Sequence, residues 1–208
     1  AECNPDAGST GLAFFVRTGA RDESIELSGV SHFLEHMCFK GTPTRSAEDV
    51  NRELDEMGSQ SNAFTSQEQT VYFCSVLPEH QLSALNLLSD IMRPTLRQSD
   101  FDTEKQVILE EIAKYDDQPP YGGHDAALVK HFKSHPLGNS VLGTAESVSA
   151  LTQPQMLEYF HRQYSANNLT LAVAGKIDFV KIVEQLEAEC GDWNNHDVQR
   201  DTQRYSTT

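Results

Sequence analysis

The sequence predicts an α+β domain in which helices pack on one face of a mixed or antiparallel sheet. Strand-like patterns lie near both ends of the chain and in its middle, and a helical block separates them. With 38% hydrophobic and 23% charged residues, the 208 residues suffice for one domain with a sizeable core. The longest apolar stretches, such as residues 11–16, are far shorter than the roughly 20 residues of a membrane-spanning helix. We therefore expect a soluble globular domain without a membrane span.

Capping and turn residues set the expected elements of the first half. The alternation of Leu12, Phe14 and Val16 with their neighbours is typical of a strand buried largely on both faces. Ser46 and Asp49 form a capping box, in which each side chain bonds the other residue's backbone at the start of a helix. The expected order is a strand over 9–18, a helix over 29–39, a helix between 46 and 58, and a hairpin of strands 59–65 and 70–77.

The second half is mainly helical, with one further strand. Leucines recur at three-to-four spacing from Leu82 to Leu88, and Pro94 ends that helix. Thr152 and Gln155 form a second capping box. The expected order is helices over 78–93, 99–115, 123–133 and 152–164, a strand over 169–174 and a helix over 178–190. Residues 191–208 are polar and aperiodic, so we assign 1–190 to the folded domain and 191–208 to a linker or frayed tail.

The charge and the cysteines exclude several kinds of partner and site. Sixteen Lys and Arg against 31 Asp and Glu give a net charge of −15, so the chain repels a phosphate backbone and nucleic acid is excluded as a partner. Basic peptides fit this charge. The four cysteines are dispersed without a Cys-x-x-Cys pair, which favours a reducing compartment over a disulfide framework or a cysteine zinc site.

One pentapeptide, residues 32–36, reads His-Phe-Leu-Glu-His, or H-x-x-E-H. Residues four apart on a helix lie about 5–6 Å apart at Cβ, so His32 and His36 can bind one cation. Glu35 is close enough to act as general base on water at the metal without being a ligand. The pattern also arises by chance in roughly one such sequence in 40, and two histidines on a helix face can serve packing alone.

A third ligand is expected in the helix over 99–115, because a catalytic zinc site has three protein ligands and one open position. Ile108 and Ile112 mark the apolar stripe of this helix. Glu104 and Glu111 lie within that stripe, two turns apart, whereas Glu110 points away. Burying two carboxylates on the inward face costs desolvation free energy unless a positive charge lies beside them. A zinc ion supplies that charge. The alternative is an amphipathic helix with an irregular border.

Short motifs follow one another along nearly the whole chain. They are residues 18–23 (TGARDE), 32–36 (HFLEH), 40–42 (KGT), 62–65 (NAFT), Glu104 with 107–112 (VILEEI), 135–137 (HPL), 142–144 (LGT), 164–168 (YSANN) and 174–175 (AG). In this order they resemble the inverted-motif zinc metallopeptidases, a family that includes pitrilysin, insulysin and the processing subunit of mitochondrial processing peptidase. The resemblance is strongest to the bacterial processing-peptidase-like branch, and it is far more specific than the pentapeptide.

The resemblance implies roles for individual residues. By position, the family's zinc ligands correspond to His32, His36 and Glu111, its catalytic base to Glu35, its auxiliary glutamate to Glu104 and its substrate-binding edge strand to Asn62 and Ala63. A peptide in extended form can hydrogen-bond along an edge strand whatever its side chains, so cleavage sites can vary. Without the resemblance, Asn62 and Ala63 read as part of an ordinary hairpin strand.

The resemblance also implies partners and a place in the cell. Family subunits contain two homologous domains of about this size, so residues 1–190 correspond to the N-terminal catalytic domain. A homologous second domain or subunit is then the implied partner, beside a peptide or polypeptide substrate and one zinc ion per chain. The bacterial branch implies the cytoplasm, and the mitochondrial matrix is the alternative.

Three functions compete on these observations. The first is a zinc metalloendopeptidase, a hydrolase in which Glu35 activates water to cleave extended peptides or unfolded polypeptide segments. The second is a non-catalytic structural subunit of the same fold, which has no need of Glu35 or Glu111. The third is an acidic peptide-binding adaptor, which leaves carboxylates on an apolar stripe unexplained. The sequence favours the first.

Overall fold

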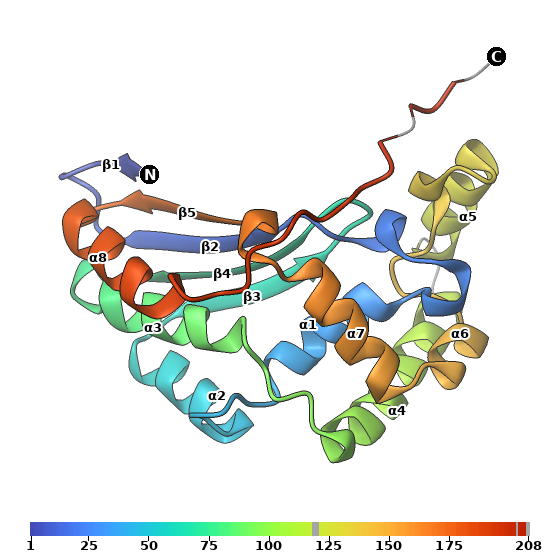
Figure 1. Cartoon of the computed structure of the whole chain (residues 1–208), viewed down its shortest axis with the longest axis horizontal. Coiled ribbons are helices and arrows are strands. Elements are labelled where there is room, and N and C mark those ends of the chain that lie inside the picture. Colours follow the sequence, from blue (N-terminus) through green and yellow to red (C-terminus); the bar gives the residue numbers. More distant parts are fainter. Residues whose placement is uncertain (118–120, 203, 207–208) are drawn as a thin grey trace.

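The computed structural model describes residues 1–117, 121–202 and 204–206, and it confirms the α+β prediction (Figure 1). A five-stranded sheet has the order β1-β5-β2-β4-β3, in which β1 and β5 are parallel and all other neighbours antiparallel. The strands are β1 (Glu2–Cys3), β2 (Thr10–Val16), β3 (Gln60–Thr65), β4 (Thr70–Val76) and β5 (Leu169–Gly175). The α-helices are α1 (Val30–Cys38), α2 (Ala47–Glu56), α3 (Gln81–Ile91), α4 (Gln98–Asp117), α5 (Tyr121–Phe132), α6 (Ala145–Ala150), α7 (Gln153–Gln163) and α8 (Phe179–Cys190).

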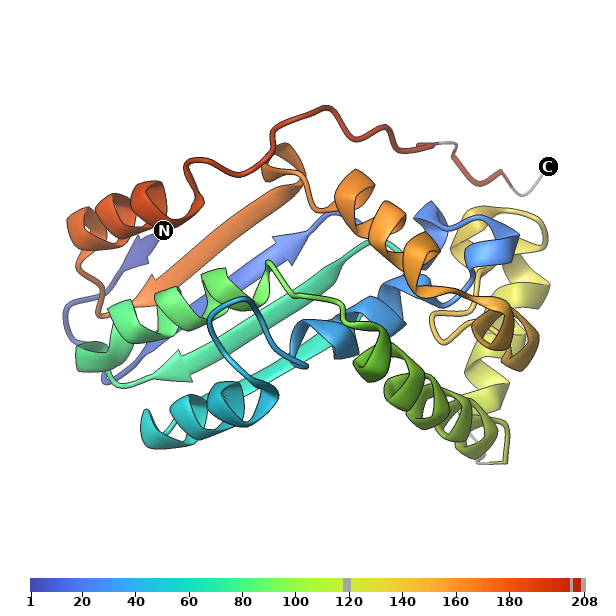
Figure 2. The same cartoon turned by 60° about the horizontal axis from the view of Figure 1, so that its bottom comes forward.

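Helices α1, α2, α3 and α8 lie on one face of the sheet, and α4 to α7 gather toward one end of it (Figures 1 and 2). Helix α3 packs against β2 and β4, and α8 packs beside α3. On β2, Leu12, Phe14 and Val16 point into this core, while the alternate residues are only partly buried. The expectation of a strand buried on both faces was therefore wrong for β2. Its second face borders a hollow of about 710 Å³, which Phe15 and Phe73 help to line.

Strand β3 lies at one edge of the sheet. It pairs with β4, to which residues 66–69 connect it in the predicted hairpin. Its far side therefore carries backbone groups that the sheet does not use, and such groups can pair with another extended chain. Helix α1 packs close to β3, so this free edge lies beside the H-x-x-E-H segment.

One strand and one α-helix were not predicted. Strand β1 has two residues and α6 has six, and Thr144 and Ser147 form a capping box at the start of α6. Both elements are too short for hydrophobic periodicity to reveal. In the part of the chain that the structure describes, no helix is both long and apolar enough to span a bilayer.

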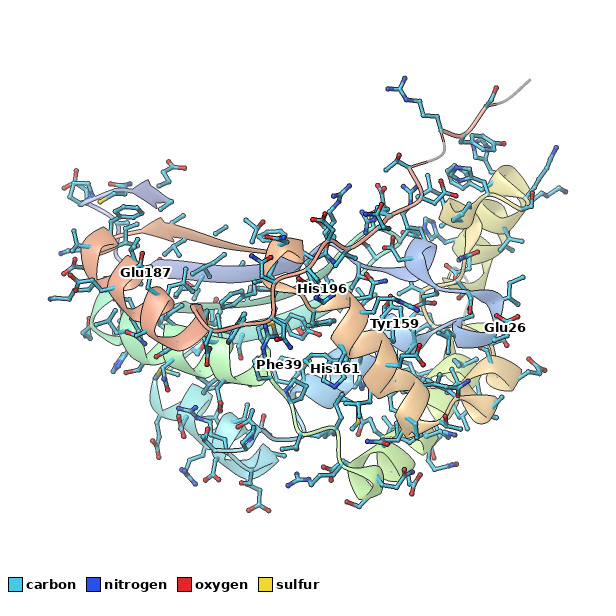
Figure 3. All side chains as sticks on the ribbon, in the orientation of Figure 1. Glu26, Phe39, Tyr159, His161, Glu187 and His196 are labelled. Carbon is cyan, nitrogen blue, oxygen red and sulfur yellow. The ribbon has the colours of Figure 1, made fainter. Side chains whose placement is uncertain are left out.

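The polar C-terminal segment is held against the domain, although its composition suggested a linker or frayed end. We call residues 191–202 the C-terminal strap. Its Asn194 accepts a hydrogen bond from the Ala166 amide (2.9 Å), and the Ser165 hydroxyl donates to the carbonyl of His196 (2.8 Å). Figure 3 labels His196 where the strap passes α7, which carries Tyr159. The strap then continues toward α5 (Figure 1).

Candidate metal centre

Helix α1 carries both motif histidines, and backbone constraints fix where it begins. Gly29 precedes it with a φ of 91°, and a Cβ there would lie 2.5 Å from the carbonyl oxygen of Leu142, so glycine is required. The Glu23 carboxyl accepts hydrogen bonds from the amides of Gly29 (2.7 Å) and Ser31 (2.8 Å). These bonds satisfy two of the amides that a helix start leaves without partners. The apolar residues of α1 fill the core, and its other face packs toward α4 and β3.

The structure brings His32, His36 and Glu111 together, with ligand atoms that all lie within 4.8 Å of one another. Oε2 of Glu111 is 3.8 Å from Nε2 of His32 and 3.7 Å from Nε2 of His36. Tetrahedral zinc with bonds of about 2.0–2.2 Å separates its ligand atoms by roughly 3.4 Å. The two observed separations exceed this by only a few tenths of an ångström. The donor set, two imidazoles and one carboxylate, is one that catalytic zinc uses.

Glu104 lies behind His36 and orients its ring. Oε1 of Glu104 is 2.8 Å from Nδ1 of His36, and Oε2 is 2.7 Å from Nζ of Lys40. With Nδ1 engaged by the carboxylate, Nε2 is the nitrogen that faces Glu111. Glu104 is 4% exposed, Glu111 is partly buried on the same side of α4, and Glu110 is exposed.

The pKa values of the two histidines are shifted in opposite directions. Burial, together with the nearby charge of His36, lowers the pKa of His32 to about 3, so its ring is neutral at neutral pH. Burial also lowers the pKa of His36, but the hydrogen bond that its ring donates to Glu104 and the charges of Glu104 and Glu111 outweigh this effect and raise the pKa. Metal ligation requires a neutral ring, so the lowered pKa of His32 favours ligation, whereas the raised pKa of His36 makes protons compete more strongly for its ring.

Glu35 lies on the same face of α1 and is 9% exposed. Burial raises the pKa of its carboxyl, and a hydrogen bond from the Thr65 hydroxyl to Oε2 (2.5 Å) opposes the shift. A raised carboxyl pKa suits a group that must accept a proton and later return it. Thr65 ends β3, so the edge strand contacts Glu35 directly.

A cleft of about 640 Å³ opens over the three clustered side chains. Ala63 and Phe64 of β3 form one wall, and His124 and Asp125 of α5 lie on another. Asn62 is exposed, and its Oδ1 accepts the amide hydrogen of Ala63 (2.8 Å), so its NH₂ group remains as a donor. Asn62 and Ala63 also border a second hollow, which Glu35 and His36 help to line. The edge strand thus contributes to two hollows that share Glu35, His36 and Ala63.

Sequence reasoning missed four residues of the site. Lys40 lies two residues beyond the end of α1, and its contact with Glu104 depends on how α1 packs against α4. Thr65 ends a motif that was noticed, but its contact with Glu35 depends on how β3 packs against α1. His124 and Asp125 come to the cleft from α5, and no spacing along the chain reveals that.

Comparisons with known proteins place the chain in a family. Residues 1–145 match the family described as Insulinase (Peptidase family M16), and residues 150–208 match the Peptidase M16 inactive domain. The chain belongs to peptidase family M16. The predicted relationship to this family of zinc metallopeptidases is confirmed. Strand β5 falls in the second matched region and pairs with β1 and β2 of the first, so the two regions share one sheet.

Its curated relatives are bacterial proteins described as uncharacterized zinc proteases. The chain is 39% identical over 187 residues to YmxG of Bacillus subtilis, covering 88% of this chain and 46% of that protein. It is 39% identical over 184 residues to a protein of Rickettsia felis, and 37% identical over 188 residues to Rv2782c of Mycobacterium tuberculosis, covering 45% and 43% of those proteins. The chain thus spans about half the length of these relatives.

Solved structures of two proteases have the same fold. A protease from Helicobacter pylori superposes with a TM-score of 0.87 at 24% identity, over 95% of this chain and 48% of that one. The periplasmic protease PqqL from Escherichia coli superposes with a TM-score of 0.85 at 24% identity, over 96% of this chain and 23% of that one.

Proposed function

We propose that this chain is the zinc-binding half of a metalloendopeptidase that hydrolyses peptide bonds in extended peptides or unfolded polypeptide segments. One observation carries the proposal. Nε2 of His32 and Nε2 of His36 converge on Oε2 of Glu111, and Glu35 lies beside them below the edge strand. Membership of a peptidase family and relatives described as zinc proteases support it.

His32, His36 and Glu111 are the proposed ligands of a single zinc ion. When bound, zinc polarises a carbonyl group and lowers the pKa of water at the site to about 7. The Nδ1 atom of His32 is buried and has no hydrogen-bond partner among the described residues, so Nε2 is the nitrogen of this ring that faces another ligand. Glu104 holds the His36 ring in the matching orientation.

Glu35 is the proposed general base. Thr65 occupies its Oε2, which leaves Oε1 to accept a proton from the attacking water. The protonated carboxyl then donates to the nitrogen of the leaving amine. The raised pKa of Glu35 favours the first transfer, because a carboxyl that is too acidic would not take the proton.

Strand β3 is the proposed substrate-binding strand. A peptide that adds to its free edge gains main-chain hydrogen bonds independent of sequence, and its backbone then passes over Glu35. The small side chain of Ala63 permits close approach, and the NH₂ group of Asn62 can donate to the peptide.

We further propose a homologous second domain as partner and a bacterial cytoplasmic location. The relatives are about twice as long as this chain, and the cleft has walls only from β3, α1, α4, α5 and a neighbouring loop among the described residues. All four cysteines are free, which agrees with a reducing compartment, although one structural neighbour is described as periplasmic.

The test combines metal analysis with hydrolysis of an internally quenched peptide. We expect one zinc per chain, slow hydrolysis by the chain alone, and faster hydrolysis when the second half of a relative is supplied. Zinc without hydrolysis in either setting would indicate a structural subunit, and binding of basic peptides without zinc would indicate an adaptor. High activity of the monomeric chain, unchanged by the added half, would refute the need for a second domain.

A further inference from the structure

The C-terminal strap is fastened to the domain by a buried ion pair between Arg200 and Asp22. Nε of Arg200 donates to Oδ1 of Asp22 (2.8 Å), and its Nη2 donates to Oδ2 (2.6 Å). The same Nη2 donates to the carbonyl oxygen of Glu68 (2.6 Å). The side chains of Arg200 and Asp22 are only 9% and 6% exposed. A bidentate pair of this kind fixes the orientation of the two side chains as well as the distance between them.

A second arginine, Arg21 of the loop, links the same three segments. Arg21, the neighbour of Asp22, donates from Nη2 to the carbonyl oxygen of Asp201 (2.7 Å). Its Nη1 pairs with the carboxylate of Glu68. The strap, the loop over residues 19–23 and the β3–β4 turn are therefore tied together by an arginine from the strap and an arginine from the loop.

The loop over residues 19–23 precedes the metal-site helix α1, and residues 24–29 connect the two. It is pressed against the β3–β4 turn, because a Cβ on Gly19 would lie 2.2 Å from the carbonyl oxygen of Ser66. Glu23 follows Asp22 and accepts the amide hydrogens of Gly29 and Ser31 at the start of α1. His32 follows Ser31 directly in the chain. A shift of Asp22 therefore displaces its neighbour Glu23, and with Glu23 the start of α1, which sets the position of His32, the first proposed ligand.

The β3–β4 turn leads to the proposed base. Glu68, whose carbonyl oxygen accepts from Arg200, is three residues after Thr65, and Thr65 donates to Glu35. The Ser66 amide donates to the carbonyl of Gln69 (2.8 Å), and this hydrogen bond closes the turn. Arg200 therefore touches two segments: the loop over residues 19–23, which hydrogen-bonds the start of α1 through Glu23, and the β3–β4 turn, which follows Thr65, the residue that hydrogen-bonds Glu35.

We propose that Arg200 is a positioning residue, through which order in the C-terminal strap sets the geometry of the metal centre. It acts on the start of α1 through Asp22 and Glu23, and on Glu35 through the turn and Thr65. The proposal rests on the proposed zinc site. If the proposal is right, the strap helps to position the residues of the metal centre and is not a passive linker.

The test compares Arg200→Gln with Arg204→Gln, which removes the same charge from an exposed residue that follows the strap. Zinc affinity is measured by competition with a chelator, and backbone exchange at Gly29 and Ser31 by hydrogen–deuterium exchange. We expect Arg200→Gln to weaken zinc binding by about 3- to 10-fold, below the 10–100-fold typical of a residue that bonds a ligand directly. Exchange at Ser31 should accelerate by about tenfold. Arg204→Gln should change neither quantity.

Two further variants keep the test decisive. Arg200→Lys retains the charge and the fold but not the two-pronged contact, so it should give a smaller loss in the same direction. In the Asp22→Asn and Arg200→Gln double variant, the loss of zinc affinity should be less than the two single losses combined, because both act through one contact. If the chain binds no zinc at all, the proposed function fails, while exchange at Ser31 still decides the role of Arg200.

The proposal is overturned if Arg200→Gln or Arg200→Lys lowers the urea midpoint while zinc affinity and Ser31 exchange in the native state keep their parent values. That result would make the pair a purely structural clamp. It is also overturned if Arg204→Gln changes both quantities as much as Arg200→Gln does, because charge alone would then explain the effect.

Discussion

Replacing Glu104 by glutamine tests how the site holds His36. In the parent chain one carboxylate oxygen engages Nδ1 of His36 at 2.8 Å and the other engages Lys40 at 2.7 Å. Glutamine keeps the shape and one acceptor oxygen but removes the charge. Its NH₂ group must then face either the ammonium of Lys40 or the ring nitrogen of His36, so one of the two contacts is lost.

The expected effect follows from which contacts remain. Loss of a residue that bonds a metal-binding histidine typically costs 10–100-fold in metal affinity, or about 1.4–2.7 kcal/mol. Glu104→Gln keeps one hydrogen bond and should weaken zinc binding by about tenfold. Glu104→Leu keeps none and should weaken it by about a hundredfold. The metal-free fold should change less, because Lys40 is 38% exposed and its ion pair with Glu104 is partly screened.

Competition with a chromogenic chelator measures both affinities, and urea unfolding of the metal-free chain measures stability. Glu110→Gln is the matched control, since it makes the same substitution on an exposed position of α4. It should stay within twofold of the parent. A zinc affinity for Glu104→Gln within the same twofold would show that this carboxylate does not orient His36.

Three further predictions concern neighbouring carboxyl groups. Glu111→Gln should weaken zinc binding by at least about a hundredfold while Glu110→Gln does little, and equal losses would contradict the assignment of the third ligand. Glu35→Gln should retain zinc but lower peptide hydrolysis by about 10²–10⁴-fold or more, and hydrolysis at the parent rate would exclude it as the base. Burial raises the pKa of Glu23 from 4.5 to about 7, although two backbone amides oppose the shift. The native state then keeps a proton that the unfolded chain releases, so the free energy of unfolding falls by about 3 kcal/mol as pH rises from about 4.5 to 7. In urea titrations Glu23→Gln should remove this fall and the exposed Glu26→Gln should not; a pH-independent difference between parent and Glu23→Gln would contradict it.

The sequence indicated those parts of the site that depend on one helix at a time. The spacing within α1 places His32, Glu35 and His36 on one face, and the phase of α4 separates Glu111 from Glu110. Both inferences need only the 3.6-residue period and a decision about which face is buried. The four main strands and the order of the longer helices were predicted for the same reason, since their patterns repeat over several residues.

Contacts between distant segments could not be predicted in this way. Thr65 reaches Glu35 because β3 packs beside α1, and no local pattern encodes that distance. The C-terminal strap has no apolar period, so its composition suggested a frayed end. It is held by contacts with distant residues, among them the pairing of Arg200 with Asp22, 178 positions apart in the chain. The sequence did not reveal that the second face of β2 is only partly buried. Sheet faces that helices cover and sheet faces that stay open can carry similar apolar residues.

The central claim is that His32, His36 and Glu111 hold one zinc ion, and X-ray diffraction from crystals grown with zinc tests it most directly. An anomalous difference map from data at the zinc absorption edge should contain one strong peak per chain. That peak should lie about 2.0–2.2 Å from Nε2 of both histidines and from a carboxylate oxygen of Glu111. Below the edge the peak should disappear. A fully zinc-loaded protein whose peak lies elsewhere, or is bound by Glu110 or Glu104 in place of Glu111, would contradict the account.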